Sequence, residues 1–205
     1  MLTVELTYDP DIDCPADDCT WTLYSFGRRH STYKDPDELG LGPLSADGTP
    51  KVYDPELRAK LEKGLAFWLS YFEHGSCLWF LRGDQTPPGV EFQWDGRRLA
   101  GLLVWEHPED HIGGKTLEER RADARGFLEE YTAWCNGEGL GYTITDEDGE
   151  YVDGGVGLLG PKHLGDIAAE TLAGKEFLVT GEAAGYEDIL RERVRLLEVA
   201  RANKE

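Results

Sequence analysis

The chain has 205 residues, of which 40% are apolar, and a formal net charge of −19. Small soluble domains usually carry a net charge of roughly 2–8 in magnitude, so this excess of carboxylates argues against binding to nucleic acid or to anionic lipid. It favours association with basic proteins instead. The 6 Trp, 9 Tyr and 7 Phe residues supply the buried area that a folded core needs.

The chain is predicted to begin with two strands. Residues 2–8 (LTVELTY) alternate apolar and polar side chains, and residues 21–26 (WTLYSF) are rich in aromatic residues. Residues 31–50 are dense in Asp, Gly and Pro without an apolar period, which predicts a loop. A helix is then expected, with Asp54 as its cap and Pro55 as its first residue. Its core-facing side consists of Leu57, Leu61, Leu65, Trp68 and Phe72.

Two almost continuously apolar segments follow, residues 76–82 and 99–105, and they predict central strands that are covered on both faces. A second long helix is expected to start at Thr116, which forms a capping box with Glu119, and to run to about Asn136.

The remainder of the chain is predicted to form a hairpin and two helices. The segment GYTITDEDGEYVDGG reads as two short strands around a turn at Asp148-Gly149, and a short helix is expected from Pro161 to about Leu172. Residues 186–204 then place apolar side chains at helical spacing. Residues 185–205 hold five acidic and five basic side chains, so this last helix is charge-balanced.

These elements predict an α+β fold, with a mostly antiparallel sheet packed against two or three helices. We expect residues 1–173 to form a single domain and residues 174–205 to be an appended amphipathic helix. Such a helix can pack on its own domain or mediate a homodimer by packing on a second copy of the chain.

Two segments are rich in carboxylates. Residues 8–19, YDPDIDCPADDC, contain five aspartates and no lysine or arginine, and the predicted hairpin carries further acids. An EF-hand does not fit, because Cys14 and Thr20 occupy the positions of its glycine and its glutamate. We therefore expect an exposed acidic binding face. Its residues are Asp9, Asp11, Asp13, Asp17, Asp18, Asp146, Glu147, Asp148, Glu150 and Asp153.

A zinc site is the alternative for part of this region. Cys14 and Cys19 could join His74 and Cys77 as a Cys₃His ligand set. The spacing permits this site without requiring it, and cysteines that bind no metal are the commoner explanation. We expect no cofactor. The fourth cysteine of the chain is Cys135. Because four cysteines are too few and too scattered for a disulfide scaffold, we expect thiols and not disulfides.

The start of the sequence, MLTVELTYDPD, lacks the basic residues and apolar stretch of a signal peptide, and no segment approaches 18 consecutive apolar residues. We therefore expect a cytoplasmic protein without a membrane partner.

Five segments in order resemble a family of uncharacterised proteins from tailed phages and other mobile elements. They are YDPDIDCPADD, YSFGRRHSTY, YFEHGS, FQWDGRRLAG and GEGLGYTITDEDGEYVDGGVGLLG. The family carries a His-Ser-Gly segment, a Trp-Asp-Ser-Gly-Gln-x-Gly segment, and a Tyr-Gly-Tyr hairpin that ends Asp-Ser-Cys-Trp-Gly-Phe-x-Gly. The matching positions are His74, Trp94, Asp95, Gly101, Gly141, Tyr142, Asp153, Gly157 and Gly160.

The resemblance covers roughly residues 5–173, and the chain departs from it at two places. Gly96-Arg97-Arg98 replaces Ser-Gly-Gln, and Gly154-Gly155-Val156 replaces Ser-Cys-Trp, so polar groups and an aromatic ring of the family are missing. The resemblance implies a phage or mobile-element origin and no particular chemistry.

Three functions follow from these observations. The expected one is a non-enzymatic inhibitor of phage or mobile-element origin, whose acidic face imitates DNA and engages a basic, nucleic-acid-handling host protein. The second is a metal-dependent enzyme or small-molecule binder around His74 and Asp95, which predicts that these side chains converge at a pocket. The third is a structural or assembly protein that self-associates through its last helix.

Overall fold

The computed structural model describes residues 1–17, 20–46, 48–93 and 95–203. The chain forms two compact units. The first unit consists of Met1–Asp13 with Ala133–Glu205, and the second of Cys14–Thr132. The second unit is therefore an insertion within the sequence of the first. This division differs from the predicted boundary at residue 173, because the C-terminal segment shares a sheet and a core with the N-terminal strand.

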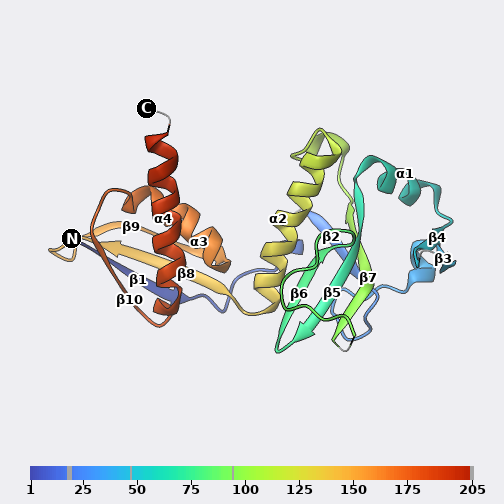
Figure 1. Cartoon of the computed structure of the whole chain (residues 1–205), viewed down its shortest axis with the longest axis horizontal. Coiled ribbons are helices and arrows are strands. Elements are labelled where there is room, and N and C mark those ends of the chain that lie inside the picture. Colours follow the sequence, from blue (N-terminus) through green and yellow to red (C-terminus); the bar gives the residue numbers. More distant parts are fainter. Residues whose placement is uncertain (18–19, 47, 94, 204–205) are drawn as a thin grey trace. The chain divides into compact units, whose positions relative to one another are not determined.

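The first unit is a four-stranded sheet with two helices (Figure 1). Its strands lie in the order β10-β1-β8-β9. β1 is antiparallel to β8 and parallel to β10, so α3 makes a crossover between the parallel strands β9 and β10. The elements are β1 (Leu2–Tyr8), β8 (Gly139–Thr145), β9 (Tyr151–Leu159), α3 (Gly160–Leu172), β10 (Phe177–Thr180) and α4 (Glu187–Ala202).

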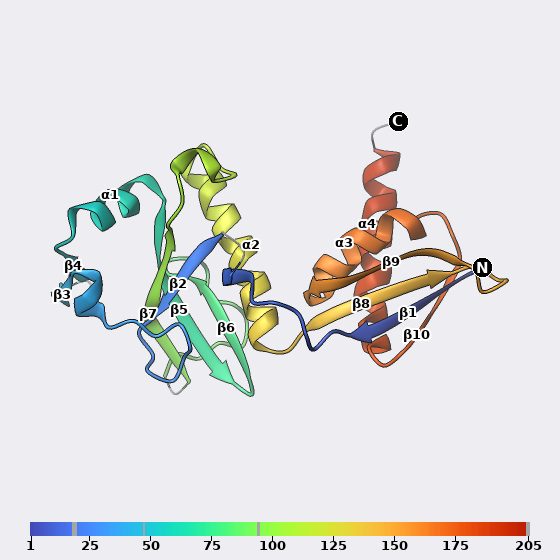
Figure 2. The same ribbon diagram turned by 180° about the vertical axis from the view of Figure 1, so that it is seen from behind.

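Both helices of this unit cover the same face of the sheet. Val4 and Ile144 on the sheet are fully buried against Leu164 of α3 and Leu190 of α4. Seen from behind, the sheet lies in front of the two helices (Figure 2). The opposite face is polar, since none of Thr3, Glu5, Thr7 and Thr143 is buried. The C-terminal helix therefore packs on its own unit.

The second unit is built around an antiparallel sheet with the order β2-β7-β5-β6. One face packs on α2, where Trp21 donates to Asp123 (2.8 Å) and the ring of Trp79 meets that of Tyr131. The other face is covered by α1 and the β3–β4 hairpin. The elements are β2 (Trp21–Ser25), β3 (Leu41–Leu44), β4 (Pro50–Val52), α1 (Pro55–Lys63), β5 (Ala66–His74), β6 (Ser76–Leu81), β7 (Gly96–Trp105) and α2 (Leu117–Cys135).

The predicted α+β class and the mostly antiparallel pairing are confirmed. The predicted first helix is wrong beyond residue 63. It ends at Lys63, and Gly64, with a φ of 70°, forms a left-handed C-cap. Of the residues expected to continue the helix, Leu65 directly precedes strand β5, and Trp68 and Phe72 lie within it. Apolar residues at steps of three and four fit either structure when both faces are buried. The short strands β3, β4 and β10 also lie where no strand was predicted.

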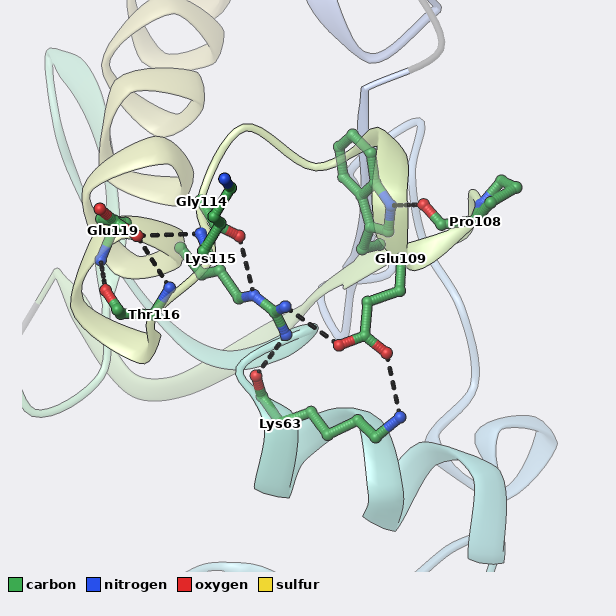
Figure 3. Close-up of polar contacts among 9 residues, drawn as sticks. Lys63, Pro108, Glu109, Gly114, Lys115, Thr116 and Glu119 are labelled. Carbon is green, nitrogen blue, oxygen red and sulfur yellow. Dashed lines mark hydrogen bonds and ion pairs between the residues drawn. The ribbon is translucent and has the colours of Figure 1, made fainter.

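The start of α2 follows the predicted capping box. The Thr116 hydroxyl accepts from the Glu119 amide (3.2 Å), and the Glu119 carboxylate accepts from the Thr116 amide (2.8 Å), as Figure 3 shows. The next residue, Arg120, is buried and donates to the carbonyls of Gly114 and Lys63 and to the Glu109 carboxylate. These contacts join the end of α1 to the start of α2. Among the described residues, no helix is long and apolar enough to cross a membrane.

Candidate functional site

A cavity of about 810 Å³ opens at one end of the sheet of the second unit. At this end β2 finishes at Ser25, β5 finishes at His74 and β7 begins at Gly96. The volume lies within the range of ordinary small-molecule sites, roughly 300–1,000 Å³. The lining residues are Phe26, Gly27, Arg28, Arg29, His30, Tyr71, Glu73, Asp95, Gly96 and Arg97.

His30 is held rigidly in this cavity. Its Nδ1 lies 2.6 Å from the hydroxyl of Ser25, which is fully buried and also accepts the Gly27 amide (3.0 Å). The rings of Tyr71 and Trp79 meet the imidazole edge-on, with centroids at 4.8 and 5.3 Å. Because Nδ1 is occupied by the hydroxyl, Nε2 is the ring nitrogen left for a ligand.

The loop that carries His30 is shaped by the sequence around Ser25. The Ser25 amide donates to the Thr32 carbonyl and the Lys34 amide donates to the Ser25 carbonyl, which closes the loop on itself. Glycine at position 27 leaves room for these groups, since a Cβ there would lie 3.1 Å from the His30 ring and 3.3 Å from the Ser25 hydroxyl, which is tighter than ordinary contact. The serine and the glycine thus fix where the imidazole sits.

Burial lowers the pKa of His30 below its ordinary value. The negative charge of Glu73 opposes this shift, and the positive charge of Arg97 adds to it. At neutral pH the imidazole is therefore mainly uncharged. A bound anion near Nε2 would favour the protonated form.

Three arginines line the cavity, and none of them has an ion pair with a described residue. Arg28 and Arg29 extend from the loop after β2, and Arg97 is the second residue of β7. Within the part of the chain that the structure describes, none of the three has a carboxylate within 4.0 Å. Elsewhere in the same unit arginines are paired, as Arg121 and Arg125 are with Asp84. Guanidinium groups that no protein acceptor uses are available to an anionic ligand.

Two carboxylates share the cavity with these arginines. Glu73 accepts from the Tyr71 hydroxyl (2.9 Å), and Asp95 lies 2.9 Å from Nδ1 of His74. The Glu73 amide donates to the Asp95 carbonyl, so the two residues are neighbours across β5 and β7. Each carboxylate uses one oxygen in these contacts, and its second oxygen makes no side-chain contact with a described residue.

The structure therefore brings His74 and Asp95 together, as the small-molecule alternative predicted, although only Asp95 lines the cavity. It does not bring the predicted acids of the first unit to one place. Asp9 follows the end of β1 that pairs with Leu140, whereas the turn at Asp146 follows the end of β8 that pairs with Thr3. At about 3.3 Å per residue, these two ends lie roughly 17–20 Å apart.

Several of the predicted acidic residues accept hydrogen bonds from nearby groups of their own unit. Asp9 accepts the amides of Asp11 and Gly157, and Asp146 accepts those of Asp148 and Glu150. Asp153 lies toward α3, where it accepts from the hydroxyls of Thr171 (2.6 Å) and Tyr142 (3.2 Å). The contact with Thr171 lowers the pKa of Asp153.

The remaining acids are Asp11, Asp13, Glu147, Asp148 and Glu150, all exposed. Asp18, Cys19 and Trp94 lie outside the described residues, as does the side chain of Asp17.

The predicted zinc site has no counterpart in what the structure describes. Across residues 1–17, 20–46, 48–93 and 95–203, no group of three His, Cys, Asp or Glu side chains could hold a metal ion. This covers Cys14, His74 and Cys77 but not Cys19.

The sequence contains one indication of the cavity, which is easily overlooked because the chain as a whole is acidic. The tripeptide Gly-Arg-Arg occurs twice, as Gly27-Arg28-Arg29 and as Gly96-Arg97-Arg98, in a chain where acids outnumber bases by 40 to 21. One Gly-Arg-Arg segment directly follows strand β2, and the other begins strand β7. Only the fold shows that Arg28, Arg29 and Arg97 line one cavity.

Comparison with protein-family models, with curated proteins and with solved structures gives no match to this chain.

Proposed function

We propose that the second unit binds a small molecule with an anionic group, a phosphate or a carboxylate, in the cavity around His30. The observation that carries this proposal is the set of three arginines that line one cavity without an ion pair in the described part of the chain. Guanidinium groups bind phosphate and carboxylate oxygens with two parallel hydrogen bonds, which gives both strength and direction.

The other groups of the cavity suit such a ligand. His30 presents Nε2 from a fixed ring, so it can donate to or accept from a ligand oxygen. The rings of Tyr71 and Phe26 offer apolar surface for the body of the ligand. One water occupies roughly 30 Å³ in the liquid, so the 810 Å³ cavity has room for a molecule much larger than an inorganic ion.

The test compares two neighbouring arginines. Arg97 lines the cavity, whereas Arg98 stacks its guanidinium over the Phe92 ring (4.5 Å) and is not part of the lining. Both R97Q and R98Q remove one positive charge from the same strand. Binding of inorganic phosphate, AMP, ribose 5-phosphate, glutamate and glutarate is measured by calorimetry.

We expect at least one of these probes to bind, and R97Q to weaken it about tenfold or more while R98Q does not. The proposal is wrong if the wild-type protein binds none of them, or if the two variants lose affinity equally.

As a second candidate we propose that the first unit engages a basic protein, in keeping with the phage or mobile-element origin that the resemblance implies. This unit has 19 acidic and 7 basic residues, a net charge of −12. Its hairpin turn exposes Glu147, whose side chain is 80% accessible, together with Asp148 and Glu150. Such a surface attracts cationic proteins at low ionic strength.

Capture of basic nucleases or DNA-binding proteins from a bacterial host lysate tests this candidate. We expect capture at low salt, its loss at high salt, and its loss when Glu147, Asp148 and Glu150 are changed together to glutamine or asparagine. Capture that does not depend on these residues would contradict it. Self-association through α4 stays a prediction, for which the outward-facing Ile189, Leu196 and Val199 are the residues to test.

A further inference from the structure

The carboxylates of the cavity are as informative as its arginines. Glu73 and Asp95 lie in the same cavity as Arg28, Arg29 and Arg97, yet among the described residues none of the arginines pairs with either carboxylate. Three cations and two anions are thus kept apart within one binding site. A site built only for an anion would gain nothing from two negative charges, which oppose the ligand.

We infer that the ligand carries a second group besides its anionic one, an ammonium or an N–H donor, and that Glu73 and Asp95 bind it. This inference rests on the proposed function of the cavity. Two classes of small molecule have this chemistry. One is an α-amino acid, with a carboxylate and an ammonium. The other is a nucleotide, with a phosphate and the amino group of its base.

The positions of Arg97 and the two carboxylates are set by the sheet. Arg97 on β7 is directly opposite Tyr71 on β5, so Glu73 lies two residues further along β5. The hydrogen bond between the Glu73 amide and the Asp95 carbonyl (2.9 Å) places both carboxylates just beyond the end of this pairing. The sheet therefore places Arg97 diagonally across from Glu73, so that one ligand can contact groups of both charges.

Each carboxylate also has one oxygen that can accept a hydrogen bond from the ligand. The Tyr71 hydroxyl occupies Oε2 of Glu73, and His74 occupies Oδ2 of Asp95. Oε1 of Glu73 and Oδ1 of Asp95 are the oxygens left for the ligand. The neighbouring groups orient the carboxylates, and an N–H donor on the ligand would complete their hydrogen bonding.

The test uses two pairs of ligands, in each of which one member carries the donor and the other lacks it. AMP is compared with ribose 5-phosphate, which lacks the base, and glutamate is compared with glutarate, which lacks the ammonium. Affinities are measured by calorimetry for the full-length wild-type protein and for E73Q and D95N. The control is E62Q, which removes one negative charge from an exposed position on α1 outside the cavity.

The expected changes have opposite signs within a pair. For the ligand with the donor, E73Q or D95N weakens binding about tenfold or more, since a charge-assisted hydrogen bond is lost. For its partner without the donor, the same variants leave affinity unchanged or raise it, because a repulsive charge has gone. E62Q changes neither. The pair that shows this inversion identifies the class of ligand, nucleotide or amino acid.

Three results bear on the inference. If both members of each pair respond in the same direction to E73Q and D95N, the inference fails while the anion site stands. The same holds if the ligands without donors bind as tightly as their partners. If neither these four ligands nor inorganic phosphate binds the wild-type protein, the proposed function fails as well. Thermal unfolding of each variant shows that the measured changes come from folded protein.

Discussion

The two units of this protein use charge in opposite ways. The first has a net charge of −12, but its carboxylates are spread over the two ends of its sheet, and several of them hold turns and strands. The second unit has 21 acidic and 14 basic residues, a net charge of −7, and three arginines of one cavity have no ion pair among the described residues. The candidate site therefore lies in the second unit, which has the smaller net charge.

The units also differ in how their sheets are covered. In the first unit α3 and α4 cover one face and leave a threonine-rich face uncovered by helices of that unit. In the second unit both faces are buried, by α2 and by α1 with the β3–β4 hairpin. A sheet that is buried on both sides cannot bind through its faces. Its candidate site lies at the strand ends, where loops are free to vary.

The largest expected effect tests whether the two units are separate cooperative units. Leu164 on α3 and Leu102 on β7 are both completely buried, in different cores. Replacing either by alanine should cost about 2–5 kcal/mol of the stability of its own unit. Five of the six tryptophans lie in the second unit, so its unfolding can be followed by fluorescence, and hydrogen exchange reports on both units.

We expect L164A to accelerate exchange in β1, β8 and β10 with little change in the tryptophan transition, and L102A to do the reverse. If each variant destabilised both units equally, the division into two units would have to be abandoned.

A second comparison separates structural arginine from binding arginine. Arg120 is buried and donates to two carbonyls and to Glu109, whereas Arg97 is exposed and has no ion pair in the described chain. R120M should lower the stability of the second unit by roughly 2–4 kcal/mol, because buried acceptors lose their donors. R97Q should change stability by less than about 0.5 kcal/mol. Chemical denaturation measures both, and a large effect of R97Q would contradict its assignment to binding.

The pH dependence of the second unit should depend on Asp84. Its hydrogen bond with Arg125, together with that of Arg121, lowers the pKa of this carboxyl. The unfolded chain then binds the proton more readily, so the contribution of Asp84 is complete above its ordinary pKa and is lost as the pH falls through the lowered one.

We expect D84N to be about 1.5–3 kcal/mol less stable than the wild type at pH 7, with a difference that shrinks as the pH falls below the ordinary pKa of an aspartate. Denaturation followed by tryptophan fluorescence across this range is the measurement. A constant difference at all pH values would mean that the carboxylate charge is not what matters.

The smallest effect concerns salt. Screening of self-repulsion should stabilise the unit of charge −12 more than the unit of charge −7 as the salt concentration rises to about 1 M, where the screening length is ~3 Å. We expect a shift of a few degrees in the unfolding of the first unit and less in the second. Hydrogen exchange during thermal unfolding at two salt concentrations distinguishes them, and equal shifts would show that the charge difference has no energetic weight.

Elements with local signals were predictable from the sequence. The capping box of Thr116 and Glu119 and the turn at Asp148-Gly149 depend on side chains that bond the backbone nearby, and the structure contains both. The segment after Gly64 was predicted incorrectly because a strand buried on both faces has no polar alternation. Strand β10 was missed because its pairing with β1 joins residues about 175 positions apart.

In the candidate site, too, local features could be predicted from the sequence and long-range contacts could not. Asp95 with His74 could be proposed from the sequence, and the glycine at position 27 and the two Gly-Arg-Arg segments could be read there. That Ser25 orients His30, and that Arg28 and Arg97 reach one cavity, could not be read. These contacts depend on which strands are neighbours in the sheet.

By itself, then, the sequence determined that the protein is acidic, that its fold is α+β, and where a few turns and helix caps are fixed by adjacent residues. The tertiary structure alone decided where charge is concentrated and where it is left unpaired. The physical reason is distance, because electrostatic and hydrogen-bonding energies depend on separation in space, and strand pairing rather than chain order sets that separation.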